Sequence, residues 1–84
     1  MQRILVVDDA EINRELLKDV LQEEYLVETA VDGEEALLWL EKTFESTAAL
    51  LLDLNMPRLN GFAVLDEMEK RGWMGLLPVL VISG

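Results

Sequence analysis

The chain of 84 residues contains neither cysteine nor histidine. The absence of cysteine excludes disulfide bonds, thiolate chemistry and cysteine-ligated metals. Because histidine and cysteine are the usual ligands of zinc, we expect no zinc site either. Without histidine, the chain also cannot act as the donor of a phosphoryl group carried on a histidine ring. Disulfide scaffolds, thiol enzymes and zinc proteins are therefore not expected.

Basic residues are scarce: 7 lysines and arginines stand against 17 aspartates and glutamates, giving a net charge of −10. Nucleic acids and anionic membranes attract proteins through basic patches, so we expect no direct binding to either. No apolar run approaches the length needed to cross a bilayer, and the N-terminus lacks the layout of a signal peptide. We therefore expect a cytoplasmic protein that binds a cation or a basic partner surface.

The length and composition predict one small domain. A chain of this size buries roughly 60–65% of the surface that it exposes when unfolded, so its stability depends on a well-filled core. Hydrophobic residues make up 51% of the chain and charged residues 29%, which is typical of a globular protein. We find no repeats, low-complexity segments or internal linkers in the sequence.

Two hydrophobic periods alternate along the chain. Short apolar runs predict strands, and apolar residues spaced three and four apart predict helices. The expected strands cover residues 3–7, 25–30, 48–53 and 78–82, the expected helices cover 12–21, 34–44 and 61–71, and a loop is expected at 45–47. This β-α-β-α-β-α-β order implies right-handed crossovers and a parallel α/β sheet.

The same patterns predict which residues face the core. The strands at 3–7, 48–53 and 78–82 are almost continuously apolar, so we expect them to be buried on both faces. The strand at 25–30 is more polar and belongs at an edge of the sheet. In the helices, the residues expected on the apolar side are Ile12, Leu16, Leu17, Val20 and Leu21, then Ala36, Leu37, Leu40 and Phe44, and finally Phe62, Leu65 and Met68.

Polar side chains stand where three of these strands end. Asp8 and Asp9 follow the first strand, Asp53 ends the third and Ser83 ends the fourth. Because the carboxyl ends of parallel strands meet at one edge, we expect the three carboxylates and the hydroxyl to converge there. Their mutual repulsion, on the order of several kcal/mol at most, is removed by a divalent cation. Oxygen ligands suit Mg²⁺, and an aspartate beside it is a plausible phosphoryl acceptor.

Each of these residues also has a structural interpretation. Asp8 or Asp9 could cap the first helix, a contribution of roughly 1 kcal/mol, and Asp53 could open an Asx turn after its strand. Gly61 is better explained by a tight entry into the third helix than by chemistry. The two tryptophans and four methionines are interpreted as packing residues. Only the joint placement of the aspartates favours a functional site.

Four motifs together resemble the receiver domain of two-component response regulators. They are ILVVDD at 4–9, AVDGEEAL at 30–37, LLLDLNMPRLNG at 50–61 and PVLVISG at 78–84, in the order and spacing of that family. The resemblance implies a flavodoxin-like, doubly wound parallel sheet with strand order 2-1-3-4. It also implies that residues 1–84 form a receiver domain that lacks the last helix-strand-helix portion of the family.

The resemblance implies a role for each matching residue. Asp53 corresponds to the phosphoacceptor, Asp9 to a direct Mg²⁺ ligand and Asp8 to an acidic neighbour that acts on the ion mainly through water. Asn55 would offer its backbone carbonyl to the metal, so the implied metal set is Asp8, Asp9, Asp53 and Asn55. Ser83 matches the switch hydroxyl that binds the phosphoryl group, and the small Gly84 would leave the acceptor accessible.

A receiver domain implies a sensor histidine kinase or a phosphotransfer protein as its partner. The phosphoryl group comes from that partner's histidine or from a small acyl phosphate, so we expect a phosphoacceptor in a phosphorelay and not a turnover enzyme. A haloacid-dehalogenase-type phosphatase also uses a strand-end aspartate, but it requires a second acid two residues later. That position holds Asn55, so we reject this class.

The chain departs from the family because it stops after the fourth strand. The family's phosphoryl-contacting lysine ends a fifth strand, whereas the three lysines here, Lys18, Lys42 and Lys70, fall within expected helices. We therefore expect impaired phosphorylation. The fourth strand becomes an edge, which predicts a homodimer through that edge. The alternative function is an interaction or dimerisation module that uses the same fold without phosphoryl transfer.

Overall fold

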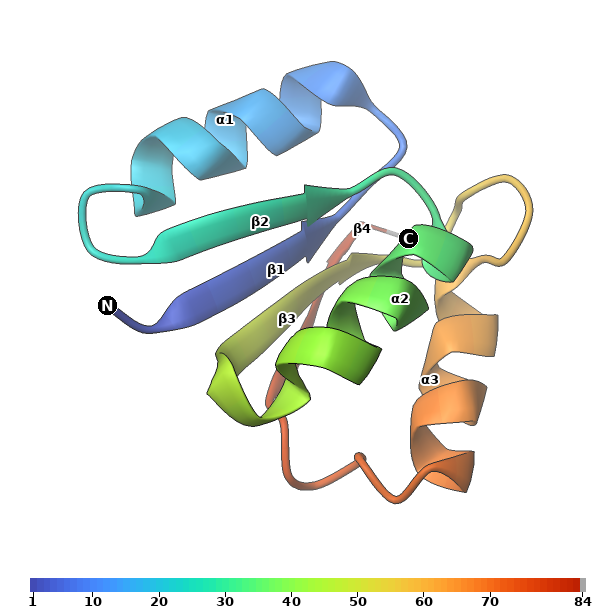
Figure 1. Ribbon diagram of the computed structural model, residues 1–84. Coiled ribbons are helices and arrows are strands. Elements are labelled where there is room, and N and C mark those ends of the chain that lie inside the picture. Colours follow the sequence, from blue (N-terminus) through green and yellow to red (C-terminus); the bar gives the residue numbers. More distant parts are fainter. Residues whose placement is uncertain (84) are drawn as a thin grey trace.

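The computed structural model describes residues 1–83; Gly84 and the side chain of Ser83 lie outside the described part. The chain alternates strands and helices along its whole length (Figure 1). The elements are β1 (Arg3–Val7), α1 (Glu11–Leu21), β2 (Leu26–Ala30), α2 (Gly33–Thr43), the short 3₁₀ helix η1 (Phe44–Ser46), β3 (Thr47–Asp53), α3 (Gly61–Lys70) and β4 (Val79–Ser83). The predicted order is confirmed.

All three strand pairings are parallel, and the strand order is β2-β1-β3-β4. Val7 at the end of β1 lies between Ala30 of β2 and Leu52 of β3. Asp53 of β3 pairs with Ser83 of β4 after a register shift. The carboxyl ends of all four strands therefore meet at one edge of the sheet. The predicted flavodoxin-like α/β fold with order 2-1-3-4 is confirmed, and so is the edge position of the second strand.

The hydrophobic core lies between the sheet and the pair α2 and α3, which cover one face, while α1 lies on the other face (Figure 1). The inward positions predicted for the second helix are confirmed at Ala36, Leu37 and Leu40, which are all buried. Burying each such leucine contributes about 1.5–3 kcal/mol. Phe44 also packs against the core, but it is only partly buried and belongs to η1. The fully buried side chains of the core include Leu5, Val7, Leu40, Leu50, Leu52, Val64 and Met68.

The predicted inward face of α3 is wrong at Phe62, which is 63% exposed. The buried residues of this helix are Gly61, Val64 and Met68. Gly61 approaches the backbone of Asp53 so closely that an added Cβ would stand 2.4 Å from its carbonyl oxygen. This contact fixes the rotation of the helix about its axis. Positions 61, 64 and 68 then face the core, and Phe62 is turned away.

The apolar stripe of α1 is largely exposed, and none of its residues is buried. Ile12 and Val20 are each 74% exposed, because among the described residues no second helix covers this face of the sheet. The prediction that the fourth strand is buried on both faces is also wrong. Leu80 is 55% exposed, since β4 forms the outer edge and only β3 pairs with it.

Side-chain caps begin both helices of the covered face. Asp32 Oδ1 accepts the Glu35 N–H of α2 over 2.9 Å, and Asn60 Oδ1 accepts the Ala63 N–H of α3 over 3.0 Å. The loop predicted at 45–47 is partly wrong, because 44–46 form η1 and Thr47 already belongs to β3. Hydrogen bonds from the Thr47 hydroxyl to Thr43 continue the helical turn up to the strand.

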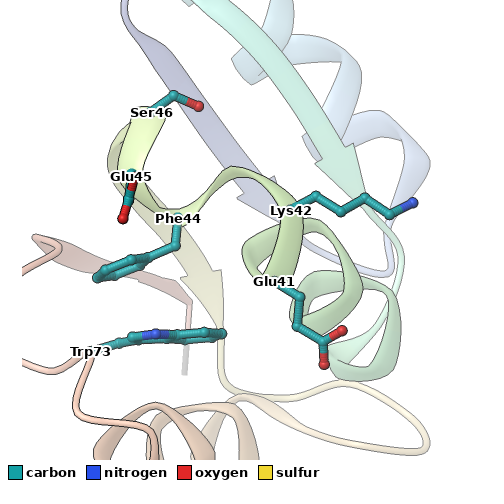
Figure 2. Close-up of a pocket in the computed structure, with 6 residues that line it drawn as sticks. All are labelled: Glu41, Lys42, Phe44, Glu45, Ser46 and Trp73. Carbon is teal, nitrogen blue, oxygen red and sulfur yellow. The ribbon is translucent and has the colours of Figure 1, made fainter.

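Trp73 anchors the amino ends of β3 and β4, opposite the edge where the strands end. Its ring stacks on Phe44 with centroids 5.0 Å apart, and the Arg71 guanidinium lies 5.0 Å from its centroid. Phe44 and Trp73, together with Glu41 and Glu45, line an open hollow of about 510 Å³. Figure 2 shows the two rings lying face to face. Trp39 and Trp73 both pack against the core, which confirms that the tryptophans are packing residues.

Candidate functional site

Three carboxylates gather at the carboxyl edge of the sheet. Asp8 and Asp9 follow β1, Asp53 ends β3, and one carboxylate oxygen of each lies within 4.8 Å of the others. Asp8 and Asp53 are only 2% and 5% exposed, whereas Asp9 faces solvent. The strand order explains the cluster, because β1 and β3 are direct neighbours in a parallel sheet. The expected convergence of the aspartates is found.

Asp8 is held by the beginning of α1 on both its side chain and its backbone. Its Oδ1 accepts the Ala10 N–H over 2.9 Å, and its Oδ2 accepts the Asn13 side-chain amide over 3.1 Å. Arg14 Nη1 donates to the Asp8 backbone carbonyl over 2.8 Å. The N-cap position of α1 is Ala10, which makes no side-chain cap. The interpretation of Asp8 or Asp9 as that cap is therefore wrong.

Asp53 opens the loop between β3 and α3. Its Oδ1 accepts the N–H of the exposed Asn55 over 2.9 Å, which confirms the expected Asx turn. Asn55 therefore lies directly beside the acidic cluster, at the start of the loop. The carbonyl of Asp53 packs against Gly61, so the glycine serves a tight helix entry as expected. The side chain and the backbone carbonyl of Asp53 are therefore both held by the backbone of the loop that leads to α3.

The same loop is attached to the start of α2. Leu59 accepts the Gly33 N–H over 2.8 Å, and Arg58 Nη1 lies 3.2 Å from Asp32 Oδ2. The backbone of Arg58 is left-handed, with φ 61°. The hydrogen bond from the Glu35 N–H holds the pKa of Asp32 below its usual value. Burial raises this pKa, and the hydrogen bond from Arg58 lowers it further. These contacts connect the loop that follows Asp53 to the second helix.

Only the backbone of Ser83 belongs to the described part of the structure. The backbone of Ser83 pairs with Asp53 in the sheet, so the residue stands at the same edge. Its side chain and the whole of Gly84 lie outside the described residues.

Lys18, Lys42 and Lys70 stand in the last turns of α1, α2 and α3. A helix that returns from one parallel strand to the next ends near the amino edge, so these lysines lie far from the cluster.

The donor set of the cluster fits Mg²⁺. Two oxygens bound to one Mg²⁺ at 2.0–2.1 Å lie about 3.0 Å apart in neighbouring positions and about 4.2 Å apart in opposite ones. Separations of up to 4.8 Å thus suit direct binding by two carboxylates, with the third reaching the ion through water or after a small shift. Carboxylate oxygens at a partly exposed edge are also the ligands that this ion prefers.

Sequence patterns did not reveal the residues that hold this site in place. Asn13 and Arg14 donate to Asp8, and Arg58, within the loop after Asp53, pairs with Asp32. None of the three was singled out by the sequence patterns. Asn13 and Arg14 come five and six residues after Asp8, where the first turn of a helix can reach back to its entry. That spacing could have indicated Asn13, but no spacing indicates the pairing of Arg58 with Asp32.

The chain forms a parallel α/β domain with an acidic cluster at its carboxyl edge, and comparisons with known proteins agree on its class. Residues 4–84 match the response regulator receiver domain family. The chain belongs to this family. The resemblance stated from the sequence motifs is therefore confirmed.

Individual relatives support the same conclusion. The chain is 40% identical over 84 residues to the transcriptional regulatory protein CpxR homolog of Haemophilus influenzae, covering 99% of this chain and 34% of that protein. It is 39% identical over 82 residues to the response regulator PleD of Caulobacter vibrioides, covering 96% of this chain and 18% of that protein. The chain thus spans about a third or less of the length of these relatives.

Two solved structures have the same fold. The chemotaxis protein CheY4 of Vibrio cholerae matches with a TM-score of 0.85 and 33% identity, over 96% of this chain and 67% of that one. The response regulator TrrA of Thermotoga maritima, solved in complex with Mg²⁺-BeF, matches with a TM-score of 0.82 and 40% identity, over 99% of this chain and 70% of that one.

The longest α-helices described here have 11 residues, and none of the described helices is long and apolar enough to cross a membrane.

Proposed function

We propose that this domain accepts a phosphoryl group on Asp53 in a Mg²⁺-dependent transfer from the histidine of a sensor kinase or phosphotransfer protein. The observation that carries the proposal is the cluster of Asp8, Asp9 and Asp53 at the edge of a receiver-family sheet. The homologous protein TrrA, solved with Mg²⁺-BeF, supports the same chemistry. The domain is then a phosphoprotein that is modified once per signalling event and not a turnover enzyme.

The transfer assigns a separate task to each residue. A carboxylate oxygen of Asp53 attacks phosphorus and forms the new P–O bond while the P–N bond to the donor histidine breaks. The electron pair of that bond returns to the imidazole, which takes up a proton from solvent. The Asn55 N–H donates to Asp53 Oδ1 and so helps to fix the orientation of the attacking carboxylate. The Ser83 hydroxyl would donate a hydrogen bond to an oxygen of the transferred group.

Asp8, Asp9, Asp53 and the backbone carbonyl of Asn55 would hold the metal. Bound Mg²⁺ supplies positive charge that offsets the carboxylates and the incoming phosphoryl oxygens. Asp9 is exposed and makes no hydrogen bond recorded among the described residues, so it suits direct coordination. Both oxygens of Asp8 already accept hydrogen bonds, which suits a contact through water.

Binding of beryllofluoride, a phosphoryl mimic, with Mg²⁺ tests this proposal. Calorimetry should show saturable binding to the unchanged chain and none to Asp53→Asn. The control is Asp19→Asn, which removes an exposed carboxylate from α1 and should bind as the unchanged chain does. Failure of the unchanged chain to bind, or equal binding by Asp53→Asn, would overturn the proposal.

We further propose that phosphorylation of this polypeptide is impaired. The transferred group carries negative charge, and among the described residues no lysine stands at the carboxyl edge to meet it. Incubation with a small acyl phosphate and Mg²⁺ should label Asp53 in a minority of chains. Labelling that saturates at one group per chain would contradict the impairment and leave the site assignment intact.

A second candidate function is an interaction module that dimerises through β4. The exposed Leu80 and Val81 on the outermost strand favour it, because an unpaired apolar edge is a template for pairing with another copy. Sedimentation should then show a dimer at micromolar concentration. Leu80→Lys should shift it to monomer, whereas Leu38→Lys, a similarly exposed position on α2, should not. A compact monomer of the unchanged chain would refute this candidate.

A further inference from the structure

Asn13 makes a contact for which the phosphoacceptor chemistry assigns no purpose. This residue is exposed in the first turn of α1, yet its side-chain amide donates to Oδ2 of the buried Asp8 over 3.1 Å. An exposed asparagine near a helix start would ordinarily hydrogen-bond water. The contact is therefore directed toward the acidic cluster, and its effect has to be sought there.

The hydrogen bonds of Asp8 fix the orientation of its carboxylate and leave its charge in place. Oδ1 is held by the Ala10 N–H and Oδ2 by Asn13, both neutral donors. The nearby Arg14 guanidinium donates to the backbone carbonyl of Asp8 and not to its carboxylate. No ion pair among the described residues involves the Asp8 carboxylate. Among the described residues, no cationic side chain therefore occupies the place that a metal ion would take beside this carboxylate.

Without these donors the cluster would not hold its arrangement. Oxygens of Asp9 and Asp53 lie within 4.8 Å of an oxygen of Asp8, and like charges at that separation repel. Asp8 could relieve the repulsion by rotating about its side-chain bonds. The Ala10 N–H holds only one oxygen of Asp8, so the carboxylate could still rotate about that hydrogen bond. The second bond, from Asn13, removes this freedom.

We propose that Asn13 is a positioning residue for the metal site, one that keeps the Asp8 carboxylate turned toward the ion before the ion arrives. This proposal rests on the proposed Mg²⁺-dependent function. Partners that orient metal ligands typically raise metal affinity by about 10–100-fold. Since Asp8 is expected to act through water, we place the contribution of Asn13 near the lower limit of that range.

The test is a calorimetric Mg²⁺ titration of the unchanged chain, Asn13→Ala and Asp53→Asn. Alanine favours the helix more than asparagine does, so Asn13→Ala should fold. The matched control is Gln22→Ala, which removes a neutral amide at the other end of the same helix. We expect Mg²⁺ affinity to fall about 10-fold in Asn13→Ala and to stay unchanged in the control.

Thermal unfolding with EDTA and with Mg²⁺ separates positioning from a merely structural role. Positioning predicts that the Mg²⁺-induced rise in Tm shrinks in Asn13→Ala, whereas a structural role lowers Tm equally in both buffers. An Mg²⁺ affinity of Asn13→Ala within two-fold of that of the unchanged chain, or an equal loss of affinity in Gln22→Ala, would overturn the role of Asn13. If Asp53→Asn still loses Mg²⁺ binding in the same experiment, the proposed function would be left intact. Absence of Mg²⁺ binding in the unchanged chain would overturn the inference and the proposed function together.

Discussion

Asp32 is bound at the same time by the helix that it begins and by the loop that follows the candidate phosphoacceptor. One oxygen accepts the Glu35 N–H, and the other lies 3.2 Å from Arg58 Nη1. The side chain of Asp32 is nearly buried, while that of Arg58 is two-thirds exposed. The residue therefore acts both as the N-cap of α2 and as an anchor for the loop between β3 and α3.

The two contacts of Asp32 can be separated by substitution. Asp32→Ala removes the cap and the ion pair, so we expect the free energy of unfolding to fall by about 1–2 kcal/mol. Asp32→Asn keeps a good capping side chain and should cost less. Arg58→Gln removes only a largely exposed ion pair, worth at most about 1 kcal/mol. Urea unfolding measures all three, and a loss in Arg58→Gln larger than that in Asp32→Ala would contradict the assignment.

The lowered pKa of Asp32 gives its contribution to stability a definite pH dependence. Because the unfolded chain binds this proton more readily than the folded chain, folding is favoured while Asp32 is ionised. This contribution is complete above the ordinary aspartate pKa of 3.8 and is lost as pH falls through the lower folded value. The other carboxylates titrate in the same range, so the difference between the unchanged chain and Asp32→Asn is the quantity to measure. We expect that difference to shrink as pH falls from 5 toward 2.

Gly61 should tolerate no larger residue. A Cβ there would meet the Asp53 carbonyl oxygen at 2.4 Å and Leu54 Cα at 2.7 Å, both backbone atoms that move only together. We expect Gly61→Ala to lower the free energy of unfolding by roughly 1–3 kcal/mol and to weaken Mg²⁺ binding by displacing Asp53.

Gly72→Ala is the control for that substitution. Its φ of 75° makes alanine unfavourable by about 1–2 kcal/mol, but no atom lies within 4 Å of the added Cβ. The two variants should therefore lose comparable stability, while only Gly61→Ala loses affinity for the metal. Equal Mg²⁺ affinities in the two variants would show that the loop absorbs the clash without moving Asp53.

The repulsion among the three aspartates predicts that the order of stability reverses with the metal. In EDTA, Asp53→Asn removes one of three clustered charges and should be more stable than the unchanged chain. In Mg²⁺, the unchanged chain gains the free energy of binding and the variant does not. Thermal unfolding in the two buffers checks this, and a variant that is less stable in EDTA would argue against strong repulsion.

The sequence predicted the parts of the structure that follow from chain order and local periodicity. Alternating strands and helices forced a parallel sheet, and a parallel sheet placed Asp8 and Asp53 at one edge. What escaped prediction depends on backbone contacts between distant segments. The approach of Gly61 to Asp53 set the rotation of α3 and turned Phe62 outward, and periodicity alone could not distinguish Phe62 from Val64. The pairing of Arg58 with Asp32 likewise required the folded geometry.

The stack of Phe44, Trp73 and Arg71 also makes one tryptophan a useful reporter. Arg71 pairs with Glu41 of α2 and Glu67 of α3, so the indole senses whether these two helices are still docked at their far ends. It stands at the opposite edge from the aspartates, so quenching by a bound ion should not reach it directly. Because Trp39 also fluoresces, the measurement needs a Trp39→Phe variant. A change in Trp73 emission in that variant on adding Mg²⁺ would signify that binding at one edge of the sheet alters the packing at the other.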